Sequence, residues 1–160
     1  MRLPLLGLGL ILLTIFPHPR AATEQNPLVG SWRMVSYQRV LDNGEPQNGL
    51  GEHPKGIVIL TPEGRAILLT TADGRKPAAN DTDRAELWKS MVAYSGKYRT
   101  EGNDFITSVD VSWNEEWNGT EQRRHFKIEG DKLILTTSPA PSPIYPGKSY
   151  YAKAVFEREK

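Results

Sequence analysis

Short strand-like segments, separated by turn sequences, run through almost the whole chain after residue 27. Turn sequences such as Thr61-Pro62-Glu63-Gly64 and Glu129-Gly130-Asp131 separate neighbouring segments. Eight antiparallel strands in sequence order close into an up-and-down barrel, which leaves no exposed sheet edge. We therefore predict an all-β, eight-stranded antiparallel barrel. Its strands are expected near residues 28–40, 55–61, 65–71, 94–100, 104–113, 119–129, 131–137 and 148–158.

One short helix is predicted within this series, over residues 82–93, between the third and fourth strands. Polar residues at 80–83 are typical of a helix start, and Glu86 follows Asp83 at the spacing of a capping box. One helical face would carry an apolar stripe, which we expect to pack on the barrel. The residues of this stripe are Ala85, Trp88, Met91, Val92 and Ser95.

Residues 1–22 have the layout of a secretory signal peptide. Arg2 supplies the basic start, residues 3–16 form an uncharged, Leu-rich run of 14 residues, and Ala21-Ala22 offers small residues for cleavage. The run is too short to span a bilayer, which takes about 20 apolar residues. We expect export to a periplasm or out of the cell, with an uncleaved N-terminal anchor as the alternative. Residues 23–160 are then a single barrel domain.

Charge and cysteine content exclude several kinds of partner. The chain has 20 basic and 19 acidic residues, so loss of Arg2 and Arg20 with the signal peptide leaves a net charge of −1. A near-neutral domain argues against binding to nucleic acid or to an anionic membrane surface. The sequence contains no cysteine, which excludes disulfides and a lipid-modified cysteine. After removal of the signal peptide, no stable membrane insertion is expected.

The sequence contains no motif typical of catalysis or metal binding. His53 and His125 have no second ligand at a spacing suited to zinc. Gly-x-Ser-x-Gly, a cysteine nucleophile and a Gly-rich phosphate loop are all absent from the sequence. We therefore predict no metal and no cofactor, and favour a protein without enzymatic activity.

Alternation of polar and apolar residues assigns the side chains that face the barrel interior. Phe126 and Ile128 place their face of segment 119–129 inside, so Arg124 points inward as well. A buried guanidinium needs a partner, either protein oxygens or an acidic or carbonyl group of a ligand. The candidates for contact with a ligand, including one aromatic residue at the rim, are Met34, Ser36, Tyr94, Tyr98, Thr107, Val109, Trp117, Gln122 and Arg124.

Trp32 and Arg158 are predicted to meet at one end of the barrel. Trp32 lies early in the first strand and Arg158 lies late in the last, and these two strands are neighbours in a closed antiparallel barrel. A guanidinium stacked on an indole is a favourable contact. We expect a structural pair that closes the barrel floor.

Several motifs together resemble the lipocalin-like domain found in many bacterial and fungal proteins. They are Leu28 to Tyr37 with Gly30-Ser31-Trp32, Leu60 to Arg65, Ala93 to Tyr98, Trp117-Asn118-Gly119-Thr120 followed by Arg124, Gly130 to Leu133, and Phe156-Glu157-Arg158. The resemblance covers nearly all of residues 28–158 and implies a calycin-type barrel with a central cavity. It also implies that Tyr94, Tyr98, Trp117 and Arg124 line this cavity. Relatives often carry a histidine on the fifth strand, where this chain has Thr107-Ser108.

The leading hypothesis is an exported barrel that binds a small, largely apolar molecule in its central cavity. The first alternative is a cofactor-free isomerase or cyclase acting on a small apolar substrate, with Tyr94, Tyr98 and Arg124 as the reactive groups. The second is a packed barrel without a cavity that serves as an interaction module. The sequence alone does not decide the oligomeric state.

Overall fold

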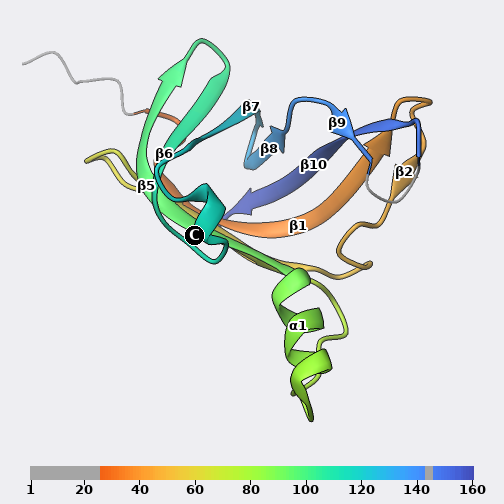
Figure 1. The fold of residues 1–160 in the computed structure, drawn as a ribbon. Coiled ribbons are helices and arrows are strands. Elements are labelled where there is room, and N and C mark those ends of the chain that lie inside the picture. Colours follow the sequence, from red (N-terminus) through yellow and green to blue (C-terminus); the bar gives the residue numbers. More distant parts are fainter. Residues whose placement is uncertain (1–25, 143–145) are drawn as a thin grey trace, which may run out of the picture.

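Antiparallel strands form one continuous sheet in the computed structural model of the chain, which describes residues 26–142 and 146–160 (Figure 1). The strands are β1 (Gly30–Leu41), β2 (Pro46–Gln47), β3 (Lys55–Leu60), β4 (Arg65–Thr71), β5 (Met91–Glu101), β6 (Asp104–Ser112), β7 (Glu121–Glu129), β8 (Lys132–Thr136), β9 (Ala140–Pro141) and β10 (Ser149–Arg158). The helices are α1 (Asp81–Lys89) and a single 3-10 turn, η1 (Glu115–Trp117).

The sheet closes on itself because β1 pairs with β10 as well as with β3. Between these contacts the long strands follow one another in chain order, while β2 and β9 have only two residues each and lie at the margins. The eight long strands therefore form a closed antiparallel barrel, which confirms the predicted all-β class and the barrel. Tight hairpins at 61–64, 102–103 and 130–131 close one end, and the longer connections 42–54, 72–90 and 113–120 surround the other.

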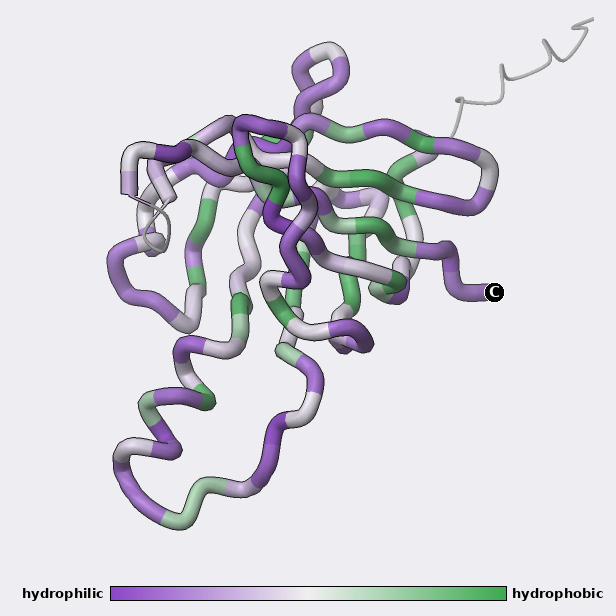
Figure 2. The backbone as a smooth tube through the Cα atoms, turned by 90° about the vertical axis from the view of Figure 1, so that its right-hand side faces the viewer, coloured by the Kyte–Doolittle hydropathy of each residue, from purple (hydrophilic) through white to green (hydrophobic). Residues whose placement is uncertain are grey.

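The helix differs from its prediction in both place and length. It follows β4, because the connection after β1 contains the additional strand β2. It also ends at Lys89, where Ser90 caps the final turn, and Met91 and Val92 already pair with β4. The expected apolar stripe is therefore split between a helix and a strand, and no helical residue is buried. In Figures 1 and 2, α1 projects as a mostly hydrophilic segment from the end of the barrel that the longer connections surround.

Two irregularities in the strands change which side chains face inward. The pairing of β1 with β10 shifts between Met34 and Ser36, and that of β5 with β6 shifts between Ser95 and Gly96. An extra residue in one strand reverses the inside–outside alternation beyond it. Val111, which unbroken alternation from the buried Val109 would turn inward, accordingly has 62% of its surface exposed.

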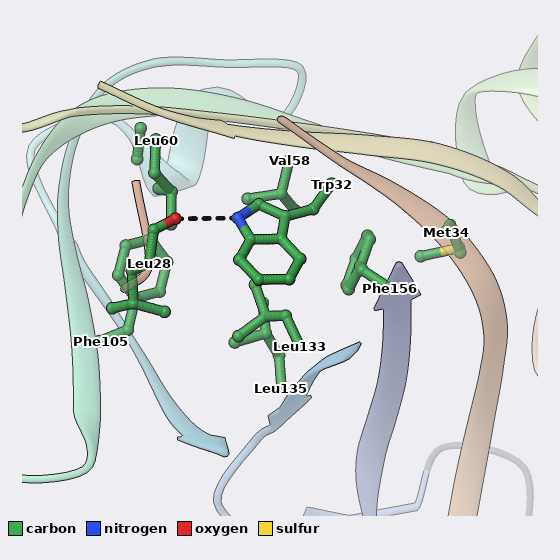
Figure 3. Packing of buried hydrophobic residues seen from close by; sticks show 10 residues of the cluster. Leu28, Trp32, Met34, Val58, Leu60, Phe105, Leu133, Leu135 and Phe156 are labelled. Carbon is green, nitrogen blue, oxygen red and sulfur yellow. Dashed lines mark hydrogen bonds between the residues drawn. The ribbon is translucent and has the colours of Figure 1, made fainter. Parts of the chain in front are cut away.

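The hydrophobic core fills the end of the barrel that the tight hairpins close, which we call the packed end. The Trp32 indole is fully buried there and donates a hydrogen bond from Nε1 to the Leu28 carbonyl oxygen at 2.8 Å (Figure 3). Figure 3 shows aliphatic and aromatic side chains from several strands surrounding this ring. The residues of the cluster are Leu28, Trp32, Met34, Val58, Leu60, Ala66, Phe105, Leu133, Leu135 and Phe156.

Arg158 covers the core at the packed end. Trp32 and Arg158 are direct partners in the β1–β10 pairing, and the guanidinium carbon lies 3.9 Å from the indole centroid. The guanidinium donates to the carbonyl oxygens of Val29 (2.8 Å) and Pro27 (2.5 Å), so its polar edge is satisfied by backbone. Gly30 has φ +140°, and a Cβ there would lie 2.6 Å from Arg158 Nη1. The Gly-x-Trp sequence is thus explained: glycine admits the guanidinium that stacks on the tryptophan.

The predicted signal peptide, residues 1–22, lies outside the described residues. Within the described ranges, no helix combines the length and the apolar character needed to cross a bilayer.

Candidate functional site

A cavity of about 440 Å³ occupies the barrel toward the end that the long connections surround, which we call the open end. Its apolar base is formed by Met34, Leu135 and Phe156, which also belong to the hydrophobic core. Ala152 and Ala154 line it from β10. Alanine side chains are small, so these two positions leave space inside the barrel.

An aromatic wall borders one side of the cavity. Trp113 precedes η1 and Trp117 is its last residue, and their ring centroids lie 4.8 Å apart in an edge-to-face arrangement. The Asn114 side chain accepts a hydrogen bond from the Glu116 backbone and so holds this turn in place. Tyr94 follows on β5, with its ring centroid 5.6 Å from that of Trp117. All three aromatic residues line the cavity, and such rings offer an apolar ligand a large rigid contact area.

Two polar groups in this wall have no partner among the described residues. The Tyr94 hydroxyl and the Trp113 indole N–H are buried and make no hydrogen bond in the described part of the chain. Burial raises the pKa of Tyr94, and the positive charge of Arg124 only partly opposes this shift. The hydroxyl therefore stays protonated at neutral pH. Leaving such a donor unpaired costs about 1–3 kcal/mol.

Arg124 and Arg39 bring positive charge to the cavity. The Arg124 guanidinium donates to the backbone oxygen of Arg123 at 2.8 Å and to Gln122 Oε1 at 3.2 Å, and its carbon lies 6.0 Å from the Trp117 centroid. The guanidinium carbon of Arg39 lies 5.9 Å from the ring centroid of Tyr150 on β10. Both arginines are only partly buried and line the cavity.

Five of the predicted ligand-contact residues meet in this cavity: Met34, Tyr94, Trp117, Gln122 and Arg124. Ser36 does not line it, because the shift in β1 turns the strand after Met34. Tyr98 belongs to the packed end, where its hydroxyl donates to the Thr61 carbonyl oxygen at 3.2 Å.

The two remaining predicted residues, both on β6, are buried away from the cavity. Thr107 is fully buried and Val109 is 3% exposed, and neither lines the open space. For Tyr98 and these two residues, the polar–apolar alternation correctly predicted that the side chain faces the barrel interior. It does not tell at which end of the barrel the side chain lies.

Tyr37 and Arg39 line the cavity, although unbroken alternation from Trp32 and Met34 would place them on the outer face of β1. Beyond the shift at Val35, these residues take the inward positions that unbroken alternation gives to Ser36 and Gln38. Burial raises the pKa of Tyr37, with the nearby Arg39 guanidinium opposing it. On β1 the cavity lining thus combines the protonated hydroxyl of Tyr37 with the guanidinium of Arg39.

Metal binding has no candidate site in the described residues, which contain no group of three or more His, Asp or Glu side chains placed to hold an ion.

The family comparison agrees with the barrel architecture. A family model described as a lipocalin-like domain matches residues 29–158. Curated proteins include no match to the chain. Among solved structures, an uncharacterized protein from Bacteroides eggerthii has 15% sequence identity and a TM-score of 0.40, over 82% of this chain and 98% of that one.

Proposed function

We propose that this chain, which belongs to the lipocalin-like domain family, binds a small, largely apolar molecule in the cavity at the open end of its barrel. The observation that carries the proposal is the cavity itself, whose volume of about 440 Å³ lies within the range of small-molecule sites. Its lining also has the composition of such sites, with aromatic and aliphatic walls and a few converging polar groups. Export through the predicted signal peptide remains part of this proposal.

The division of the barrel into two ends supports a binding role. The packed end holds the tryptophan-centred core and the arginine that covers it. Among the described residues, no side chain fills the volume at the open end, and two buried donors beside it make no hydrogen bond. An open volume costs the free protein packing contacts. A bound molecule would supply such contacts. The same volume argues against a fully packed barrel that serves only as an interaction module.

Filling the cavity tests the proposal. N-phenyl-1-naphthylamine is an uncharged probe whose fluorescence rises in apolar surroundings, and we expect the protein to bind it in a saturable manner. Ala154→Phe places a ring in the cavity and is expected to weaken this binding about tenfold or more. Val155→Phe places the same ring on the outward side of the same strand and should leave binding unchanged. Equal effects of the two variants, or no saturable binding by the wild type, would contradict the proposal.

A cofactor-free isomerase or cyclase is the second candidate, and the unpartnered Tyr94 hydroxyl favours it. Tyr94 would supply a proton and Arg124 would stabilise developing negative charge. Tyr98 has no part in this alternative, because its hydroxyl is bonded to Thr61 at the packed end. The two candidates differ in whether a bound molecule is recovered unchanged. An enzyme would convert it, and Tyr94→Phe would abolish conversion while retaining binding; a binding protein would release it intact.

A further inference from the structure

Most arginines on the outer surface of the described chain pair with carboxylates, while Arg75 and Arg158 donate to backbone carbonyl oxygens. On the outer surface, Arg33 pairs with Glu157 at 2.9 Å and Arg123 with Asp104 at 2.7 Å. Arg65, Arg84 and Arg99 likewise contact carboxylates. The two arginines that line the cavity, Arg39 and Arg124, form no ion pair with any described residue.

No group in the cavity lining neutralises these two charges. Among the described residues that line the cavity, none is Asp or Glu. Arg124 donates only to neutral oxygens, those of Arg123 and Gln122. The third cation of the lining, Lys89, is already paired with Glu86 at 2.9 Å. The cavity of the free protein therefore carries an excess of positive charge beside an apolar base, which is an unfavourable state for two guanidiniums.

The tyrosines beside the arginines do not supply negative charge either. Burial raises the pKa of both Tyr37 and Tyr94, so each keeps its proton at neutral pH. Their hydroxyls lie close enough to the arginines for the charge of Arg124 to act on both and that of Arg39 to act on Tyr37. The cavity thus brings together two cations and two neutral hydroxyls. Such a set can donate several hydrogen bonds to one acidic group.

Arg39 and Arg124 reach the cavity from different parts of the barrel wall. Arg39 lies on β1 and Arg124 on β7, and β10 and β8 separate these strands around the barrel. A group that contacts both guanidiniums is therefore held inside the barrel rather than on its outer face. The apolar base formed by Met34, Leu135 and Phe156 is left for the rest of the molecule.

We infer that the ligand of this cavity is a small organic acid with an apolar body, whose anionic group is held by Arg39 and Arg124 and whose body lies against the apolar base. This inference rests on the proposed binding function and specifies its ligand class. Guanidiniums suit it because they present paired donors that match the two oxygens of a carboxylate or similar group. The volume of about 440 Å³ limits the occupant to one molecule of drug-like size or smaller.

Two probes with the same aromatic skeleton test this inference. The anion 8-anilinonaphthalene-1-sulfonate differs from the uncharged N-phenyl-1-naphthylamine by its sulfonate group. We expect the wild type to bind the anion more tightly than the uncharged probe. Arg39→Met and Arg124→Met should each weaken binding of the anion by about tenfold, the loss expected for a hydrogen bond to a charged group, and should leave binding of the uncharged probe unchanged.

Arg33→Met is the matched control. It removes one positive charge from β1, the strand that carries Arg39, but on the outer surface, and it should leave binding of both probes unchanged. A cooperative urea melt for each variant shows that the barrel is folded.

The possible outcomes separate this inference from the proposed function. Saturable binding of both probes with equal affinity, unaffected by Arg39→Met and Arg124→Met, would overturn the inference while the apolar binding site stands. Equal losses in Arg33→Met and in the cavity variants would show a general charge effect and would also overturn it. Failure of the wild type to bind either probe would overturn the proposed function, and the inference with it.

Discussion

Trp32→Ala is expected to lower the free energy of unfolding by about 3–5 kcal/mol, as large aromatic truncations in a core do. The indole is fully buried among the residues of the packed end, so its removal leaves a cavity that rigid strands on all sides cannot fill. It also removes the hydrogen bond to the Leu28 carbonyl oxygen and the surface on which Arg158 stacks. Urea melts measure the effect.

Arg158→Ala provides the comparison for Trp32→Ala. It is expected to cost less, about 1–3 kcal/mol, because the guanidinium is only partly buried and bonds to backbone oxygens rather than filling the core. The two residues touch, so the double variant should lose less stability than the sum of the single losses. Additive losses would contradict the account of how β1 and β10 close the barrel. Neither variant should abolish probe binding at the opposite end while the barrel remains folded.

Gly96→Ala is expected to destabilise the protein by about 3 kcal/mol, the upper part of the usual range for overpacking. The reason is steric, because a Cβ at Gly96 would lie 2.0 Å from the Ser108 carbonyl oxygen and 2.7 Å from its carbonyl carbon. Both atoms belong to the backbone of β6, so no side chain can rotate to make room. Gly96 also sits at the point where the β5–β6 pairing shifts, and relief of the clash requires these strands to move apart.

Gly102→Ala is the matched control for this substitution. Gly102 lies in the β5–β6 hairpin with φ +58°, and a Cβ there would meet nothing within 4 Å. Its cost is therefore conformational alone, about 1 kcal/mol. Denaturant melts that show Gly96→Ala to be no more harmful than Gly102→Ala would contradict the close approach of the two strands.

The barrel was predictable because its signals are local and repeated. Alternation identifies each long strand, and Pro and Gly mark the turns between them, so chain order alone suggests a closed antiparallel sheet. The end of the helix was less predictable. Met91 and Val92 continue an apolar pattern with helical spacing, yet they pair with β4, and this preference arises from the neighbouring strand rather than from the local sequence.

The cavity lining was only partly predictable, for a similar reason. Arg124 was placed inward correctly because Phe126 and Ile128 mark its face of β7, and no irregularity interrupts that strand. Arg39 was missed because β1 shifts its register near Val35, and no Gly or Pro at this position signals the change. One such shift moved Tyr37 and Arg39 into the cavity and Ser36 out of it. Of the two arginines that define the proposed ligand class, Arg39 therefore became visible only in three dimensions.

Native mass spectrometry of freshly purified protein shows whether the barrel carries a ligand. We expect a complex whose added mass corresponds to one small organic acid per barrel, released on denaturation and absent from an Ala154→Phe variant. Where the producing cell lacks the ligand, stabilisation of the protein against heat by apolar acids, and not by the matching alcohols, is the equivalent result. The unliganded mass alone, together with no thermal shift across apolar acids and neutral apolar molecules, would contradict the claim that this barrel is a binding protein.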